Sequence, residues 1–440
     1  MSNKIYPIGI QNFEKIRNDG YFYIDKTALM YQMVKTGSYY FLSRPRRFGK
    51  SLLISTLEAY FQGKKELFEG LAVEKLEKDW IKHPILHLDL NIEKYDTPES
   101  LDKILNDNLE YWESQYGTRP SETSFSLRFA GIIQRACEKT GQRVVILVDE
   151  YDKPMLQAIG NEELQKQFRN TLKPFYGALK TKDGYIKFAL LTGVTKFGKV
   201  SVFSDLNNLD DISMWNEYVE ICGVSEREIH ENLEAELHEF AAARGITYDK
   251  LCEDLRECYD GYHFTHNSIG MYNPFSLLNA FKRKEFGSYW FETGTPTYLV
   301  KLLKKHHYDL ERMAHEETDV QVLNSIDSES TNPIPVIYQS GYLTIKGYDE
   351  EFGMYRLGFP NREVEEGFIR FLLPFYANVN KVESPFEIQK FVREVRSGDY
   401  NSFFRRLQSF FADTTYEVIR DQELHYENVL FIVFKRSEER

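Results

Sequence analysis

Short apolar runs that alternate with segments of helical periodicity constrain the fold of this chain more than any other feature. Each run has the length of a buried strand, and between the first three runs apolar residues recur at the spacing of a helix. Strands that alternate with helices form a mostly parallel sheet that is covered on both faces. We therefore predict an α/β core with strands at residues 39–42, 85–90, 144–148 and 186–191.

The rest of the chain predicts a helix-rich domain followed by a mixed region. The 440 residues are more than one hydrophobic core usually serves. Helical patterns dominate from Ser225, which matches a capping box together with Glu228. Beyond Thr331 the pattern is one of short strands and turns, and amphipathic helices return from Glu363. We expect a core domain (1–220), a helical domain (221–330) and an α+β C-terminal region (331–440).

Composition and charge exclude several classes of protein. Hydrophobic residues make up 42% of the chain, with 32 Phe and 29 Tyr, which is too rich in core-forming side chains for a disordered protein. The formal net charge of −12 lacks the basic signature of a protein that coats nucleic acid. No stretch approaches the roughly 18 apolar residues of a membrane span, so we expect a cytoplasmic protein. The cysteines lack metal-binding spacing and are expected to be reduced thiols: Cys137, Cys222, Cys252 and Cys258.

The loop after the first apolar run has the residue types that bind the phosphates of a nucleotide. Such a loop needs glycine, a helix N-terminus facing the phosphates, a lysine for the β and γ oxygens and a hydroxyl for magnesium. Gly49, Lys50 and Ser51 supply the glycine, the lysine and the hydroxyl in order, although Arg44 stands where the usual motif has its first glycine. The candidate nucleotide-binding residues are Arg44, Pro45, Arg46, Arg47, Phe48, Gly49, Lys50, Ser51 and Leu52.

A chance match is the alternative for this loop, with the tripeptide beginning a helix beside solvated arginines. The setting argues against chance, because the loop lies between an apolar strand and a helix of apolar periodicity. The mechanism of phosphate binding requires that setting. Arg44, Arg46 and Arg47 could neutralise phosphate charge or pair with acidic residues of another domain, and we expect at least one of them near the phosphates.

Two adjacent carboxylates, Asp149 and Glu150, end the third apolar run. The end of such a strand opens into the ligand crevice of a parallel sheet. We expect Asp149 to hold magnesium together with Ser51, and Glu150 to orient or deprotonate the attacking water. The alternative is an acidic turn, with Asp152 and the residues after it as turn chemistry. The presence of the phosphate-binding loop in the same sequence favours the catalytic interpretation of this acidic pair.

The fourth apolar run ends in Thr192, which adds a third candidate catalytic residue. A polar side chain at that strand end could sense the terminal phosphate or the attacking water. The alternative is a threonine hydroxyl that satisfies nearby backbone groups, as is common at the ends of strands.

Several long motifs, in this order along the chain, resemble the AAA-ATPase-like family of bacterial proteins. They are YFYIDKTALM, YFLSRPRRFGKSLL, VVILVDEYDKP, LTGVTKFGKVSVFSDLNNLDDI, CYDGYHF, MYNPFSLLNAF and YWFETGTPTYLVKLL. The resemblance implies an ASCE-type P-loop core with Lys50 and Ser51 as nucleotide and magnesium residues, Asp149 and Glu150 as the acidic pair, and a helical lid domain. The arginine at position 44 agrees with the form of the loop in this family.

The resemblance also bears on the C-terminal region. Family members usually continue into a domain similar to the PD-(D/E)XK nucleases, and the segment ELHYENVLFIVFKRSEER resembles the first helix of such a domain. After Val433 the sequence has no strand to carry the metal-binding carboxylates of that site. We therefore expect a truncated nuclease-like domain and no nuclease activity from this chain.

These observations predict a protein that binds ATP and Mg²⁺, hydrolyses the nucleotide and uses its state to reposition the helical and C-terminal parts. The alternative is a nucleotide-binding scaffold with little turnover, which binds a protein or nucleic-acid partner in defence or mobile-element biology. A purely structural helix-rich protein without a ligand is the third option. The sequence leaves the partner, a homo-oligomeric state and an arginine finger open, and it predicts no membrane association.

Overall fold

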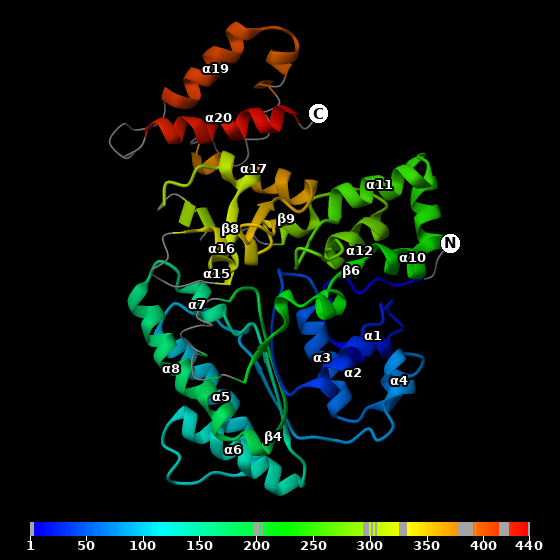
Figure 1. The fold of residues 1–440 in the computed structure, drawn as a ribbon, viewed down its shortest axis with the longest axis vertical. Coiled ribbons are helices and arrows are strands. Elements are labelled where there is room, and N and C mark those ends of the chain that lie inside the picture. Colours follow the sequence, from blue (N-terminus) through cyan, green and yellow to red (C-terminus); the bar gives the residue numbers. More distant parts are fainter. Residues whose placement is uncertain are drawn as a thin grey trace.

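The computed structural model shows a parallel sheet flanked by helices, beneath a helical domain and a C-terminal region (Figure 1). It describes residues 4–196, 208–293, 306–324, 332–376, 393–412 and 422–438, with positions 203, 206, 299–300, 302–303 and 390–391 between them.

The central sheet contains the four predicted strands and one that the sequence did not reveal. Its order is β2-β3-β4-β1-β5, and every neighbouring pair is parallel. The fifth strand has only two residues, both acidic, so it carries no apolar pattern that could predict it. The strands are β1 (Tyr39–Ser43), β2 (Ile85–Asp89), β3 (Val144–Asp149), β4 (Ile186–Gly193) and β5 (Asp210–Asp211).

Helices cover both faces of this sheet, as its buried strands require. One layer holds α5, α6 and α8 and the other holds α1 to α4, so that the sheet lies between them (Figure 1). Every residue of β1 and β3 is buried, which explains why these strands are continuous apolar runs. The helices are α1 (Phe13–Asn18), α2 (Thr27–Thr36), α3 (Lys50–Phe61), α4 (Ala72–Leu76), α5 (Pro98–Tyr116), α6 (Phe125–Thr140), α7 (Lys153–Gln157) and α8 (Glu162–Thr181), with short 3₁₀ helices at Lys65–Phe68 and Asp183–Tyr185.

The helical domain has its own apolar core. Ser225 accepts a hydrogen bond from the backbone of Glu228, whose carboxylate accepts one from the backbone N–H of Ser225, so the predicted capping box is present. The N-terminal segment packs on this domain, and Lys26 forms an ion pair with Glu228. The elements are β6 (Val224–Ser225), α10 (Glu226–Arg244), α11 (Tyr248–Tyr259), β7 (Met271–Tyr272), α12 (Pro274–Arg283) and α13 (Tyr289–Glu292), preceded by 3₁₀ helices η3 (Ile212–Met214) and η4 (Asn216–Ile221).

The C-terminal region combines a three-stranded antiparallel sheet with helices. Its buried side chains continue the apolar core of the parallel sheet, so the two parts pack together. Contrary to our expectation of strands and turns after Thr331, Ile334–Gln339 is helical, with Pro335 in its first turn where a missing N–H has no cost. The elements are η5 (Glu311–His315), β8 (Glu317–Asp319), α15 (Val320–Asn324), α16 (Ile334–Gln339), β9 (Thr344–Asp349), β10 (Met354–Gly358), α17 (Arg362–Tyr376), α19 (Tyr400–Ala412) and α20 (Gln422–Glu438).

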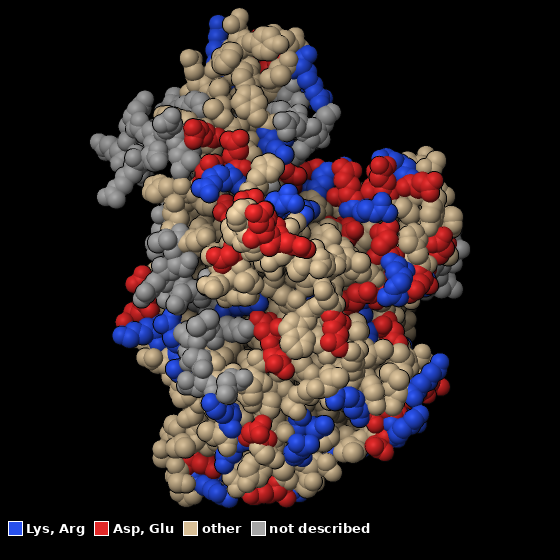
Figure 2. Space-filling view, in the orientation of Figure 1, with Lys and Arg blue, Asp and Glu red and all other residues tan. Residues whose placement is uncertain are grey.

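The surface and the helices show the following charge and hydropathy. On the face shown in Figure 2, Lys and Arg side chains are scattered among Asp and Glu and form no continuous basic stripe. None of the helices in the described part of the chain is long and apolar enough to cross a membrane.

The capping box of α10 provides a test of the helical domain. Ser225→Ala removes the acceptor for the backbone N–H of Glu228, and we expect it to lower the free energy of unfolding by about 1 kcal/mol. Ser114→Ala, at an exposed position within α5, is the matched control and should change stability by less than about 0.5 kcal/mol. Urea denaturation of both variants measures the difference. Equal stability of the two would show that this cap does not stabilise the domain.

Candidate functional site

The predicted phosphate loop connects β1 to the N-terminus of α3. Gly49 has φ 98°, a left-handed conformation that favours glycine, and Arg47 has φ 66°. The helix begins at Lys50, and no side chain caps its N-terminus. Backbone N–H groups at the start of this three-turn helix are therefore not capped by a side chain, which is the arrangement that can bind an anion.

The side chain of Lys50 brings the loop and the acidic strand end together. Its Nζ donates to the carbonyl oxygens of Arg44 and Pro45 at 3.0 and 3.4 Å. The same atom lies 3.4 Å from Oε1 of Glu150, and the Lys50 side chain is only 3% exposed. Two motifs 100 positions apart thus meet at one buried cation.

Strand order explains why Thr192 joins this site. Because β4 lies between β1 and β3, Leu42 pairs with Thr192, and Leu191 pairs with Val148. The Thr192 hydroxyl donates to Oδ1 of Asp149 at 2.6 Å. The structure therefore places Thr192 as a support for Asp149, a contact that the sequence did not indicate.

Glu150 leaves the strand in an unusual backbone conformation. Its φ of 53° lies in the left-handed region, and Oδ1 of Asp149 accepts a hydrogen bond from its backbone N–H. Strained positions of this kind cluster at functional sites. The turn points the Glu150 carboxylate toward the phosphate loop, whereas a regular extension of β3 would alternate its side chains across the sheet.

Asp152 is a further acidic residue of the site, which we interpreted from the sequence as part of a turn. It is fully buried and accepts hydrogen bonds from the backbone N–H groups of Val194 and Thr195 and from the Thr195 hydroxyl. Burial and the neighbouring charge of Glu150 raise the pKa of Asp152. Nothing in the sequence distinguishes this carboxylate from a solvated turn residue, because its partners come from the end of β4.

The three arginines of the loop have different surroundings. The Arg44 guanidinium is buried and donates to backbone carbonyls away from the helix N-terminus, although the Arg44 carbonyl faces Lys50. Arg46 donates to the Tyr342 hydroxyl at 3.3 Å. Arg47 is exposed, with its guanidinium 5.2 Å from the centre of the Phe275 ring. Arg46 and Arg47 therefore remain the candidates for phosphate contact.

The helical domain holds the backbone of the loop. The carbonyl of Arg46 accepts hydrogen bonds from Nε1 of Trp290 at 3.0 Å and from Nδ2 of Asn273 at 3.4 Å. The carbonyl of Phe48 accepts one from the backbone N–H of Gly223. Asn273 and Trp290 occur in the long motifs quoted above, but no local pattern assigns them a role in the loop.

A buried carboxylate from the C-terminal region supports Trp290 in turn. Oε1 of Glu363, near the start of α17, accepts a hydrogen bond from the backbone N–H of Trp290 at 2.7 Å. Burial raises the pKa of Glu363 to about 8. The loop, the helical domain and the C-terminal region thus form one chain of hydrogen bonds.

The residues present fit the magnesium ion that a P-loop site implies. Mg²⁺ is usually held by one or two carboxylates, a hydroxyl and the phosphates of its nucleotide. Asp149 lies at the end of β3 with Ser51 in the first turn of α3, and among the described residues no hydrogen bond reaches Oδ2 of Asp149. In the described ranges no three His, Cys, Asp or Glu side chains cluster as a metal site of protein ligands alone.

The match to a protein family agrees with this geometry. The family described as "Predicted AAA-ATPase" matches residues 7–203. The "Uncharacterized protein in vnfD 5'region" of Azotobacter chroococcum mcd 1 is 39% identical over 381 residues, which cover 86% of this chain and 71% of that relative. The Aeropyrum pernix ORC2 protein in its ADPNP–ADP complexes covers 82% of this chain and 92% of its own, at 9% identity and a TM-score of 0.28. That score is too low to indicate anything about function.

The parallel sheet and the loop at the N-terminus of α3 define a P-loop protein of the nucleotide-binding class. The chain belongs to the predicted AAA-ATPase family, as the family match and the relative from Azotobacter chroococcum show.

Glu363 gives a prediction of pH dependence. Its pKa in the folded chain is about 8, above that of an unfolded carboxyl group, so its contribution to stability is complete below about pH 4.5 and is lost as pH rises through 8. Glu363→Gln keeps an acceptor for Trp290 and removes the charge. We expect the free energy of unfolding of the variant, relative to the unsubstituted chain, to increase with pH by up to about 1.4 kcal/mol per unit between pH 5 and 8.

Chemical denaturation at a series of pH values measures this difference. Glu366→Gln, on the same helix but beside Arg362, is the control and should show a much flatter pH dependence. A flat difference for Glu363→Gln would show that this carboxylate is not buried as described.

Proposed function

We propose that the chain binds ATP with Mg²⁺, hydrolyses the terminal phosphoanhydride bond and uses its nucleotide state to reposition its helical and C-terminal parts. The observation that carries this proposal is the contact between Lys50 and Glu150 at 3.4 Å. It joins a phosphate-binding loop to the acidic end of a strand, which is the pairing that nucleotide hydrolysis requires.

Nucleotide binding would use the loop and the start of α3. Backbone N–H groups at the helix N-terminus face the phosphates, and their partial positive charge favours the anion. The Lys50 ammonium would exchange its loop carbonyls and Glu150 for the β and γ oxygens. Arg47, which is exposed beside the loop, is placed to add a further positive charge.

Ser51 and Asp149 are the residues that would hold magnesium. The bound ion would neutralise charge on the β and γ oxygens of the nucleotide. Thr192 donates to Oδ1 of Asp149, which leaves Oδ2 available to the ion. Thr192 thereby supports the site even where its hydroxyl does not touch the nucleotide.

Glu150 is the residue we assign to water activation. When Lys50 moves to the phosphates, the Glu150 carboxylate loses its cation and can accept a proton from the attacking water. The strained backbone at Glu150 directs the carboxylate toward the space above the loop. Asp152, whose pKa is raised by burial and by the charge of Glu150, is a second carboxyl group close to this site.

Repositioning of the other parts would begin at the loop carbonyls. Trp290, Asn273 and Gly223 all donate to the backbone of this loop, so an altered loop conformation breaks or strengthens bonds to the helical domain. The C-terminal region is reached through the hydrogen bond between Trp290 and Glu363. A ligand shifts such an equilibrium only when it favours one arrangement over the other. Phosphate binding would favour one loop arrangement over the other, because the phosphates contact the same short loop whose carbonyls accept these hydrogen bonds.

Lys50→Ala tests nucleotide binding. The substitution removes the cation for the β and γ phosphates while it keeps the loop backbone, and we expect the rise in melting temperature with ATP and Mg²⁺ to disappear. Lys180→Ala, on the exposed side of α8, is the control and should retain the full rise. Thermal unfolding with and without nucleotide measures both. An unchanged rise for Lys50→Ala would remove this loop as the binding site.

Glu150→Gln separates hydrolysis from simple binding. The amide cannot accept the proton of the attacking water, so we expect ATP binding to persist while phosphate release falls by at least about 100-fold. Glu162→Gln, at the exposed start of α8, should leave the rate unchanged. A nucleotide-binding scaffold would instead show the same negligible turnover in the unsubstituted chain and in both variants.

A further inference from the structure

A short turn follows β4 and lies between the acidic strand end and the C-terminal region. It comprises residues 194–196, and we call it the β4 turn. All three residues are buried, although the turn belongs to no helix or strand. Buried backbone groups outside regular secondary structure need partners from elsewhere in the chain. The partners of the β4 turn therefore show which parts of the molecule hold it in place.

One side of the β4 turn is bonded to the strand end that carries Glu150. The Asp152 carboxylate accepts hydrogen bonds from the backbone N–H groups of Val194 and Thr195 at 3.2 and 2.6 Å. It also accepts one from the Thr195 hydroxyl at 2.7 Å. The Tyr151 hydroxyl donates to the carbonyl of Thr195 at 3.0 Å. The two residues that follow Glu150 are thus both fixed to the turn by their side chains.

The residue before Glu150 is bonded to the strand that leads into this turn. Oδ1 of Asp149 accepts a hydrogen bond from the Thr192 hydroxyl at 2.6 Å. The Thr192 carbonyl accepts one from the backbone N–H of Tyr151 at 2.9 Å. Glu150 therefore lies between two residues that are both bonded to β4. The position of its backbone consequently depends on the position of β4 and of the β4 turn.

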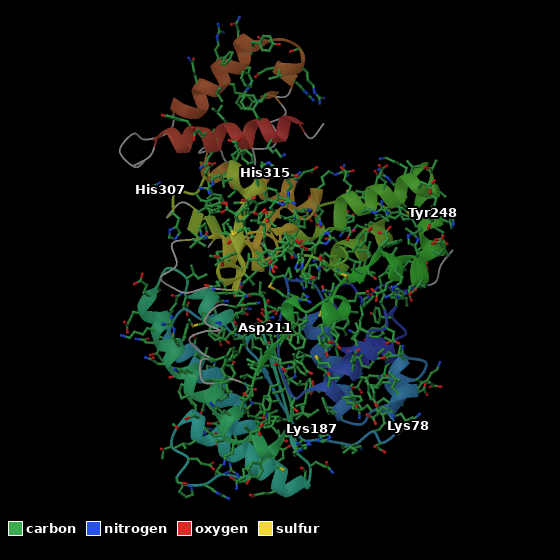
Figure 3. The ribbon with its side chains drawn as sticks, in the orientation of Figure 1. Lys78, Lys187, Asp211, Tyr248, His307 and His315 are labelled. Atoms are coloured by element: carbon green, nitrogen blue, oxygen red, sulfur yellow. The ribbon has the colours of Figure 1, made fainter. Side chains whose placement is uncertain are left out.

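The side chain of Lys196 bonds the end of the turn to two further segments. It is buried and forms an ion pair with Asp211 of β5 at 2.8 Å. Asp211 lies where the core meets the parts of the molecule above it (Figure 3). The Lys196 ammonium also donates to the side chain of Asn324, the last residue of α15. The turn thus contacts the edge of the parallel sheet and the C-terminal region.

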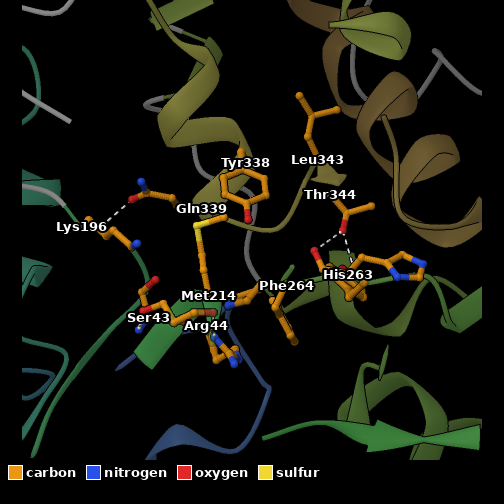
Figure 4. A pocket seen from close by; sticks show the side chains of 13 residues that line it. Ser43, Arg44, Lys196, Met214, His263, Phe264, Tyr338, Gln339, Leu343 and Thr344 are labelled. Atoms are coloured by element: carbon orange, nitrogen blue, oxygen red, sulfur yellow. Dashed lines mark hydrogen bonds between the residues drawn. The ribbon is translucent and has the colours of Figure 1, made fainter. Parts of the chain in front are cut away.

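Gln339, the last residue of α16, bonds the backbone of the turn to the C-terminal region. Its Oε1 accepts a hydrogen bond from the backbone N–H of Lys196 at 2.5 Å, drawn as a dashed line in Figure 4. Its Nε2 donates to the carbonyl of Leu323 in α15 at 2.5 Å. Gln339 is 5% exposed. A side chain without these two polar atoms would leave buried backbone groups of two segments unpaired, which is costly.

Water activation and phosphate binding depend on this turn to different degrees. Misplacement of a catalytic group by about 1 Å can lower a rate by about 100-fold, and the β4 turn holds the backbone on both sides of Glu150 through β3 and β4. In the described part of the chain, no hydrogen bond joins Lys50 to the β4 turn. A loosened turn should therefore slow hydrolysis more than it weakens nucleotide binding.

We propose that Gln339 is a positioning residue for ATP hydrolysis. It holds the β4 turn from the C-terminal region, and through Asp152 this turn holds the backbone that carries Glu150. Turnover then requires the C-terminal region to lie against the core, whereas nucleotide binding does not. The inference rests on the proposed function and adds to it a control of the hydrolysis step by the C-terminal region.

Gln339→Met tests the proposal, because methionine has a similar length but can make neither hydrogen bond. We expect kcat for ATP to fall by about 10- to 100-fold. The dissociation constant of a non-hydrolysable ATP analogue with Mg²⁺ should change by less than about threefold. Phosphate release and isothermal titration calorimetry measure the two quantities.

Asn279→Leu is the matched control, since this buried amide donates to the carbonyl of Phe275 within its own helix. It should retain the full rate. A folded Gln339→Met chain with the rate of the control would overturn the proposal. An equal loss of rate and of analogue binding would also overturn it, because a merely structural role predicts that result.

A second variant examines the opposite side of the turn. Thr195→Val removes the hydroxyl that donates to Asp152 and keeps the shape of the side chain. Because both residues hold one turn, the loss of kcat in the double variant with Gln339→Met should be smaller than the product of the two single losses. A loss equal to that product would show that the two residues act independently, which contradicts the proposal.

Hydrogen exchange gives a readout that does not need hydrolysis. Relative to Asn279→Leu, Gln339→Met should speed exchange by at least about tenfold in peptides that span residues 147–153 and 190–196. Unchanged exchange would overturn the inference. An unsubstituted chain without turnover would remove the proposed function, but faster exchange in the variant would still show that Gln339 holds the acidic strand end.

The unsubstituted chain provides the answer if Gln339→Met does not fold. The amide of Lys196 should then be protected from exchange to an extent comparable with the amides of β4. Exchange at the rate of an exposed peptide would overturn the proposal, because the bond to Gln339 could not then hold the turn.

Discussion

The position of β4 between β1 and β3 is the constraint on which the rest of the structure depends. In a parallel sheet the carboxyl ends of neighbouring strands meet at one edge. The strand order therefore delivers the phosphate loop, Thr192 and Asp149 side by side. A reversal of any one strand would carry its functional group to the opposite edge. The acidic pair and the loop would then be separated by the length of the sheet.

Local pattern was sufficient to predict the long strands of the core and the polar residues at their carboxyl ends, but not the contacts between distant parts. β1, β3 and β4 are buried almost throughout, so each appears as an apolar run, whereas β2 alternates between buried and partly exposed residues. β5 is too short and too acidic to appear as an apolar run. α16 was misassigned because two prolines near its start resemble turn chemistry. Trp290 could not be linked to the loop from sequence, because 244 positions separate it from Arg46.

Three buried ionisable groups lie where separate segments of the structure meet: Asp152, Glu363 and Arg44. Each satisfies its hydrogen-bonding capacity largely through backbone groups of another segment. Backbone partners fix position without adding an opposite charge, so these groups hold the segments together while their ionised forms stay costly. The contacts around the phosphate loop are consequently more sensitive to protonation and to ions than contacts between apolar side chains would be.

β5, the edge strand beside β1, consists of two aspartates, which discourages self-association of the sheet at that edge. An exposed strand edge offers unpaired backbone groups to which another chain can add a strand, and a short, charged edge strand discourages that addition. A second molecule that aligned with β5 would have to bring its own backbone alongside two negative side chains over only two residues. The sheet is thereby protected from intermolecular strand addition at the edge next to its phosphate loop.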